Sequence, residues 1–298
     1  NRRFPWWIND DKDIGNCADH GGSDIPGNTK SPDHTTWAVN GERDLLDLCV
    51  VMLDTECLEP LLDAGYDLQL RQDDDAVNVV YTQLNDSNAG CYLKEELENC
   101  GQYLNMMAHK ALKHQITSEG VSLPAPFRGW LRRHQGKGIF LMEGAFNSKA
   151  PLWVDLVKDR KILGKTVMHL RIAPVEEMYI RVNLRNGAAA VNQGFAMPRA
   201  NGKHAIFLHG FNVNRNDARG WHAEVFKRLW QSGSNARFHA VIWRGDIGVI
   251  NAFHYHENVV SAFNTAPHLK NYVAQLPSEK IVMAHSLGNM VVSAAIAD

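Results

Sequence analysis

One serine in the sequence has the neighbours that a reactive nucleophile requires. Ser286 lies in AHSLGN, residues 284–289, after the apolar run KIVM and before the apolar, helix-like run MVVSAAIA. A nucleophile on a sharp turn between a strand and a helix sits on strained backbone, and large side chains two positions before or after it would collide. Ala284 and Gly288 occupy these positions, so the pattern predicts a serine exposed for attack on a carbonyl carbon.

Attack on a carbonyl also requires hydrogen-bond donors for the oxyanion that forms. The helix that begins behind the serine offers the backbone N–H of Leu287. A second donor is expected from the loop after an earlier strand, and FLHGFNVN, residues 207–214, has the required features. Gly210 allows close backbone approach there, and the N–H of Phe211 is the predicted donor.

The histidines beside these residues are expected to support the loop and the turn, not to act as the base. His209 is predicted to hydrogen-bond neighbouring loops, and His285 is predicted to point away from the serine into packing. No histidine follows Ser286, and the sequence ends at Asp298. Asp298 is expected about three helical turns from the serine, which makes it a poor triad acid.

Residues 203–298 resemble the N-terminal half of the α/β-hydrolase superfamily fold. In this comparison LHGF resembles the oxyanion-hole loop and AHSLGN resembles the nucleophile elbow. The resemblance implies an α/β hydrolase-type parallel sheet, truncated after the elbow, in a lipase-like or esterase-like serine hydrolase. Such an enzyme acts on carboxylic esters through an acyl-enzyme and requires no cofactor. The triad acid and histidine are then expected from outside this sequence.

Three explanations for the missing triad residues stay open. The chain is a fragment of a longer hydrolase, a second chain supplies the closing strands, or the domain is a scaffold. A half-sheet that ends at its central strand would expose an unpaired edge and apolar faces, which favours a second polypeptide or a cleaved C-terminal segment as partner. The alternative function is a non-catalytic binding or adhesion module with a structural hydrolase-like half-domain.

Strand-like and helix-like segments alternate in the last third of the chain, as in a parallel sheet with helices on both faces. The expected strands are HAIFLHG, FHAVIW and KIVMAHS, and the expected helices are RGWHAEVFKRLWQSG, a stretch that ends near Leu276, and LGNMVVSAAIA. WRGD, residues 243–246, is interpreted as a turn after a strand in preference to an adhesion motif. HYHE, residues 254–257, lacks helical zinc spacing and is interpreted as substrate-lining or solvated surface.

The sequence before this part is β-rich and sandwich-like. Short alternating segments are typical of antiparallel strands, and a helix is expected near residues 94–114. The Ala-, Gly- and Asn-rich stretch 186–203 places the domain boundary near 195. The expected domains are therefore an N-terminal loop and helix over 1–70, an accessory β domain over 71–195 and the half-hydrolase over 196–298.

The first 70 residues combine an acidic loop with an apolar segment. Asn9, Asp11 and Asp13 alternate along the loop and make a structural calcium ion possible, but no EF-hand pattern is met and a solvated loop is favoured. The segment RDLLDLCVVMLDTECLEPLLDAG, residues 43–65, is apolar and helix-like.

Composition excludes several functional classes. A net charge of -2, from 31 basic and 33 acidic residues, argues against nucleic acid as a partner, and no apolar run is long enough for a transmembrane segment. All 5 cysteines lie within the first 100 residues of the chain. Cys49 is expected to be buried, while Cys91 and Cys100 are interpreted as thiols in preference to a disulfide. The Asp/Asn-rich loop and the accessory domain favour a secreted or cell-envelope location.

Overall fold

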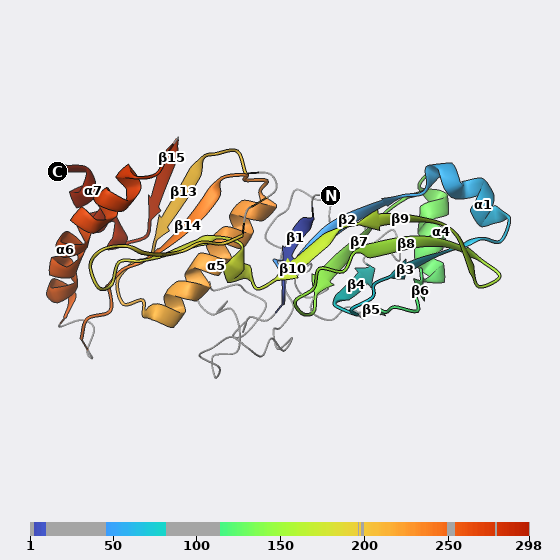
Figure 1. Ribbon diagram of the computed structural model, residues 1–298, viewed down its shortest axis with the longest axis horizontal. Coiled ribbons are helices and arrows are strands. Elements are labelled where there is room, and N and C mark those ends of the chain that lie inside the picture. The colour runs from blue at the N-terminus through green and yellow to red at the C-terminus, as the bar shows by residue number, and fades with distance from the viewer. Residues whose placement is uncertain are drawn as a thin grey trace. The chain divides into compact units, whose positions relative to one another are not determined.

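The computed structural model describes residues 3–9, 46–81, 114–195, 197, 200–248, 254–277 and 279–297. The described chain divides into two compact units between Pro174 and Val175 (Figure 1). Here the N-terminal unit means the described residues up to Pro174, and the C-terminal unit means those from Val175. Each unit has its own sheets and its own buried side chains.

The N-terminal unit is built mainly from antiparallel strands. Two sheets of 4 strands have the orders β2-β7-β4-β5 and β6-β3-β8-β9, and β1 pairs in parallel with β10. Its elements are β1 Phe4–Trp7, β2 Leu48–Asp54, η1 Glu56–Leu58, α1 Glu59–Asp63, β3 Asp67–Arg71, β4 Val77–Tyr81, β5 His114–Ile116, β6 Val121–Ser122, α4 Ala125–Arg133, β7 Lys137–Gly144, β8 Leu152–Lys158, β9 Lys161–Met168 and β10 Leu170–Ala173.

The prediction of a helix over residues 43–65 is wrong for most of that segment. Residues 48–54 form strand β2, which pairs along its whole length with β7, and only short helical turns follow. The run LCVVML contains β-branched and apolar residues that pack well on a pleated surface, and pairing with β7 decides between the two states. The helix expected near 94–114 lies outside the described residues.

The C-terminal unit contains one sheet of 5 strands in the order β12-β11-β14-β13-β15. Strands β11, β14, β13 and β15 run parallel, and the edge strand β12 is antiparallel to β11. Its elements are η2 Val175–Glu177, β11 Ile180–Asn183, β12 Ala190–Asn192, β13 His204–Leu208, α5 Arg215–Gln231, β14 Arg237–Ile242, α6 Tyr255–Ala274, β15 Lys280–Ala284 and α7 Gly288–Ala297.

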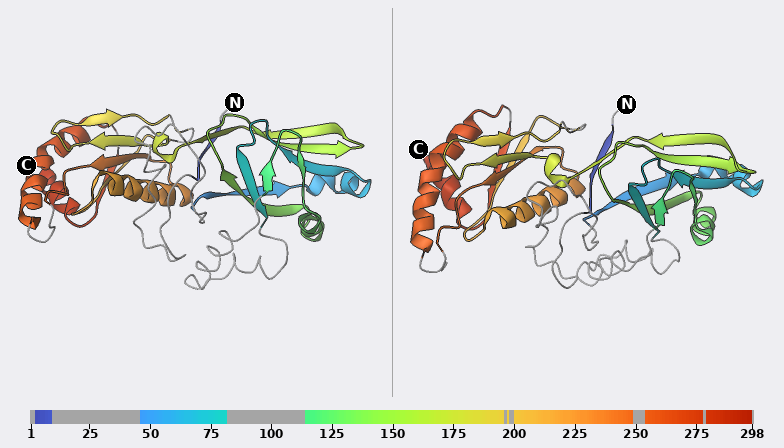
Figure 2. Two further views of the ribbon diagram at one scale, coloured as in Figure 1. Left: turned by 90° about the horizontal axis from the view of Figure 1, so that it is seen from below. Right: turned by 60° about the horizontal axis from the view of Figure 1, so that its bottom comes forward.

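Helices cover both faces of this sheet (Figure 1 and Figure 2). On one face, Phe226 of α5 packs against the ring of Phe238 in β14. On the opposite face, side chains of α6 and α7 such as Leu269 and Val291 join Ile206 of β13 in a buried cluster. Successive side chains of each apolar strand therefore pack into different cores, one on each face of the sheet, as in sheets that are buried on both sides.

The boundary between the units falls earlier than the expected position near 195. Residues 180–192, which the sequence pattern assigned to the β-rich accessory domain, form β11 and β12 of the C-terminal sheet. Ile180 and Val182 of β11 are buried in the same cluster as Val241 of β14. These side chains are buried because β11 pairs in parallel with β14. The alternating pattern of residues 180–183 indicates a strand, but it does not indicate which strand is the partner.

The N-terminal unit depends on a close contact at Gly144. A Cβ at this position would lie 2.5 Å from the carbonyl oxygen of Trp7 and 2.8 Å from Cγ2 of Ile172. We expect Gly144→Ala to lower the free energy of unfolding by about 1–3 kcal/mol, since backbone must move to admit the methyl group. Gly164→Ala is the control, because its nearest neighbour would be 3.9 Å away. Equal urea midpoints for the two variants would contradict this packing.

Candidate active site

Ser286 occupies a strained turn between β15 and α7. Its φ angle is +50°, a left-handed conformation that serine seldom adopts and that costs about 1–3 kcal/mol, and its side chain is exposed. Gly288 makes the turn possible, because a Cβ there would lie 2.6 Å from the backbone oxygen of His209. Ala284 is half-buried and pairs with Leu208 of β13. The turn and the small residues beside it thus have the geometry predicted for a nucleophile elbow.

Gly210 brings the loop after β13 directly against this turn. A Cβ on Gly210 would lie 3.0 Å from Cβ of Ser286 and 2.8 Å from Nδ1 of His285. The backbone N–H of His285 donates to the carbonyl of Leu208 at 3.0 Å, which continues the pairing of β13 with β15 up to the turn. The loop and the turn that the sequence analysis linked are therefore in contact, and any side chain at position 210 would separate them.

Two backbone N–H groups next to this contact have no acceptor among the described residues. They belong to Phe211, which follows Gly210, and to Leu287, which follows Ser286. The side chain of Leu287 is buried in the core under the sheet, and Phe211 packs at the edge of the same core. Side-chain packing fixes both residues while their N–H groups stay available to an incoming oxygen atom.

His209 is a structural residue, in agreement with the favoured interpretation. It is fully buried, its Nε2 accepts from the N–H of Trp243 at 3.2 Å, and its Nδ1 contacts the carbonyl of Gly210 at 3.0 Å. The indole N–H of Trp243 donates to the backbone oxygen of His209 at 2.8 Å. Burial lowers the pKa of His209 to about 4, so the neutral ring holds the loop in place.

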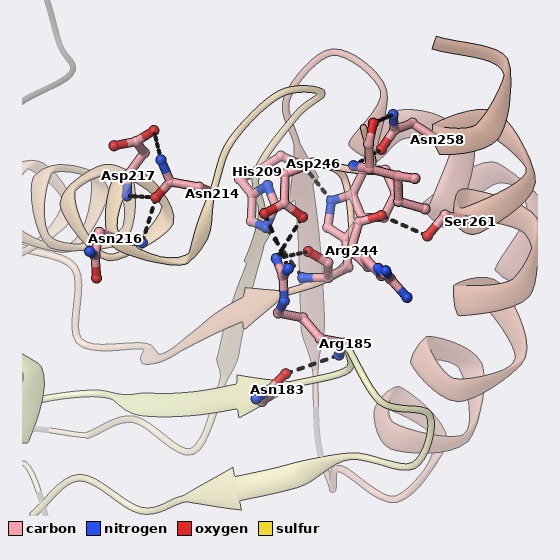
Figure 3. Close-up of polar contacts among 12 residues, drawn as sticks. Asn183, Arg185, His209, Asn214, Asn216, Asp217, Arg244, Asp246, Asn258 and Ser261 are labelled. Atoms are coloured by element: carbon pink, nitrogen blue, oxygen red, sulfur yellow. Dashed lines mark hydrogen bonds and ion pairs between the residues drawn. The ribbon is translucent and has the colours of Figure 1, made fainter. Parts of the chain in front are cut away.

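The segment after β14 forms the next support of the loop (Figure 3). The N–H of Asn212, which has a φ of +57°, donates to the carbonyl of Gly245 at 2.7 Å. Asp246 pairs with Arg185 at 2.8 Å and lies beside His209 in Figure 3. The WRGD segment is therefore a loop with a buried tryptophan and a paired aspartate, as the turn interpretation predicts.

No described histidine is bonded to the hydroxyl of Ser286. The ring of His285 lies against Gly210 and 4.8 Å from the ring of Trp221 on α5, although the residue stays exposed. His209 has both ring nitrogens engaged. Asp298 lies outside the described residues. The part of the chain that the structure describes thus contains the turn and the N–H donors but no general base in contact with the serine.

The HYHE segment begins helix α6 and contacts the loop after β13. His254 pairs with Glu257 at 3.1 Å, and the ring of Tyr255 lies 5.2 Å from the ring of Phe211. The sequence analysis missed this contact and the tilted ring contact of Trp221 with His285. Ring contacts between residues far apart in the sequence leave no periodic pattern. The one sequence signal was the position of HYHE between the second and third expected strands, which indicated a location near the site.

A chain of buried hydrogen bonds runs through the same sheet. Nδ1 of His204 lies 2.7 Å from Nε2 of His239, whose Nδ1 lies 2.6 Å from the hydroxyl of Tyr272 on α6. Burial lowers the pKa of His239 to about 4 and also lowers that of His204. His222, packed against Phe207, has a pKa well below its ordinary value for the same reason.

The remaining predicted site residues are those of the possible calcium site, Asn9, Asp11 and Asp13. Asn9 is buried, and its amide donates to Glu143 at 2.8 Å. Asp11 and Asp13 lie outside the described residues, so the calcium site stays a prediction. Among the described residues, no group of three or more histidine, cysteine or acidic side chains is placed to hold a metal ion.

The cysteine predictions are tested at one position. Cys49 is buried, and burial raises the pKa of its thiol to about 12. Cys91 and Cys100 lie outside the described residues. Among the helices described, none has the length and apolar character needed to cross a membrane.

Comparison with known proteins adds no assignment. No protein-family model matches the chain, and no curated protein or solved structure matches it either.

The buried histidines predict a pH dependence of stability for the C-terminal unit. His209 and His239 have folded-state pKa values of about 4 against an ordinary 6.5, so the unfolded chain binds more protons between these limits. We expect the free energy of unfolding to fall as pH drops from 6.5 towards 4, by up to about 1.4 kcal/mol per pH unit for each histidine.

Urea unfolding at pH 7.5, 6 and 5, followed by tryptophan fluorescence, measures this dependence. The variant His256→Gln removes an exposed imidazole and is expected to keep the wild-type profile. A stability that is constant across this range would show that the imidazoles of His209 and His239 are not held neutral in the core.

Proposed function

We propose that the C-terminal unit is the nucleophile-bearing part of a serine hydrolase that acts on carboxylic esters, as expected from its resemblance to lipase-like and esterase-like α/β hydrolases. One observation carries this proposal. Ser286 stands at a φ of +50° in contact with Gly210, and the N–H groups of Phe211 and Leu287 beside it have no acceptor in the described chain. Strained backbone and unbonded donors at one place are typical of catalytic sites.

The proposed reaction is acyl transfer. The Oγ atom of Ser286 attacks the ester carbonyl carbon, and the carbonyl oxygen gains negative charge as the tetrahedral intermediate forms. The N–H groups of Phe211 and Leu287 donate to this oxygen, which lowers the energy of the intermediate. Collapse expels the alcohol and leaves an acyl-serine, and water then releases the carboxylic acid by the same steps.

A histidine outside the described residues is proposed to accept the serine proton and return it to the leaving alcohol. Strand β15 offers a place for its carrier, because within the described chain β15 pairs only with β13. Ile281 on this strand is 59% exposed, and Ile296 on α7 is 78% exposed. A second polypeptide or a cleaved C-terminal segment that adds strands beside β15 would cover these side chains and complete the sheet.

The second candidate is a non-catalytic binding or adhesion module in which this unit is structural. The observation in its favour is the absence, in the residues that the structure describes, of any histidine bonded to Ser286. The strain at Ser286 argues against it, because a scaffold would gain stability from glycine at this position. One labelling experiment distinguishes the two candidates.

An activated serine should react with a fluorophosphonate, which forms a covalent bond to the nucleophile. We expect intact-mass spectrometry of the purified protein to show one adduct on the wild type and none on Ser286→Ala. The control Ser293→Ala removes an exposed serine of α7 and should label like the wild type. The masses of all co-purifying polypeptides identify any partner segment.

The absence of an adduct on folded wild-type protein, with every co-purifying chain retained, would contradict the esterase proposal. It would favour the scaffold. Labelling of Ser286→Ala to the same extent as the wild type would place the reactive residue elsewhere.

A further inference from the structure

Two aromatic side chains meet at the loop that is proposed to hold the oxyanion. Phe211, at the edge of the core, and Tyr255, at the first turn of α6, pack edge to face with ring centroids 5.2 Å apart. Tyr255 is 48% exposed, so much of its side chain borders solvent. Most apolar rings are buried on folding, so an exposed tyrosine ring that packs on Phe211 at a candidate active site offers a surface for a ligand.

The position of Phe211 relates this pair to the substrate. Its backbone N–H is one of the two proposed oxyanion donors, so the ester carbonyl must lie within hydrogen-bond distance of that nitrogen. The Cβ atom of the same residue is only two bonds from the nitrogen. Groups attached to the carbonyl carbon therefore lie within reach of the Phe211 side chain and of the tyrosine ring that packs against it.

A second aromatic contact borders the serine. The ring of His285, the residue before Ser286, lies 4.8 Å from the ring of Trp221. A Cβ on Gly210 would contact both His285 and Ser286, which places Gly210 beside this second pair. Planar rings from the loop after β13 and from the turn at Ser286 thus lie next to the contact between Gly210 and Ser286.

We propose that Phe211 and Tyr255 form the binding wall for the acyl group of the substrate, and that this acyl group is apolar, either a medium-length alkyl chain or an aromatic ring. The proposal rests on the proposed esterase function. Apolar groups gain affinity by covering the exposed ring of Tyr255, and aromatic acyl groups can also stack on it. Tyr255 is accordingly a specificity-determining residue, and it has no part in proton transfer.

Three p-nitrophenyl esters test the proposal: the acetate, the hexanoate and the benzoate. In the wild type, kcat/KM should be higher for the hexanoate and the benzoate than for the acetate. Tyr255→Ala should lower this preference by about tenfold while changing the acetate value little, because acetate does not reach the wall. Tyr255→Phe retains the ring and should retain the preference.

Phe263→Ala is the matched control, because Phe263 lies on the same helix and is 55% exposed. It should leave all three kcat/KM values unchanged. A preference that survives in Tyr255→Ala, or an equal loss for all three esters, would overturn the binding wall and leave the esterase function intact. Failure of every ester to be hydrolysed in a Ser286-dependent way would overturn the function, and the binding wall with it.

Discussion

The close approach of two backbone segments at the carboxyl ends of β13 and β15 is the constraint on which the site depends. Gly288 lies against the backbone of His209, and Gly210 lies against Ser286, with no room for a side chain at either position. This contact keeps the serine on its strained turn and puts the N–H groups of Phe211 and Leu287 beside it. Parallel strands suit this arrangement, because their loops emerge at the same edge of the sheet.

Polar groups that are buried behind the contact keep it rigid. His209 and Trp243 exchange hydrogen bonds between neighbouring strand ends, and Asn212 is bonded to the loop after β14. A neutral, fully bonded imidazole can hold a loop without the cost of a buried charge. The loop that carries the proposed oxyanion donor Phe211 is therefore held by buried residues, while Ser286 and Tyr255 stay exposed to solvent.

Much of this site could be predicted because its requirements are local. A strand, a turn with small flanking residues and a helix leave a contiguous pattern around Ser286, and the apolar strand before Gly210 does the same. The sequence analysis failed where distant pairing decides the structure, as in β2, whose apolar run also suits a helix, and in β11, which joins the second unit through β14. The contact of Tyr255 with Phe211 was missed for the same reason.

The central claim is that Phe211 and Leu287 hold the oxygen of a group bound to Ser286. A crystal structure of the protein after reaction with a small alkyl fluorophosphonate tests it most directly, because the phosphoryl oxygen takes the place of the oxyanion. The account predicts phosphorus bonded to Oγ of Ser286 and the phosphoryl oxygen within about 3 Å of both backbone nitrogens. A phosphoryl oxygen directed into solvent, or an adduct on a different residue, would contradict it.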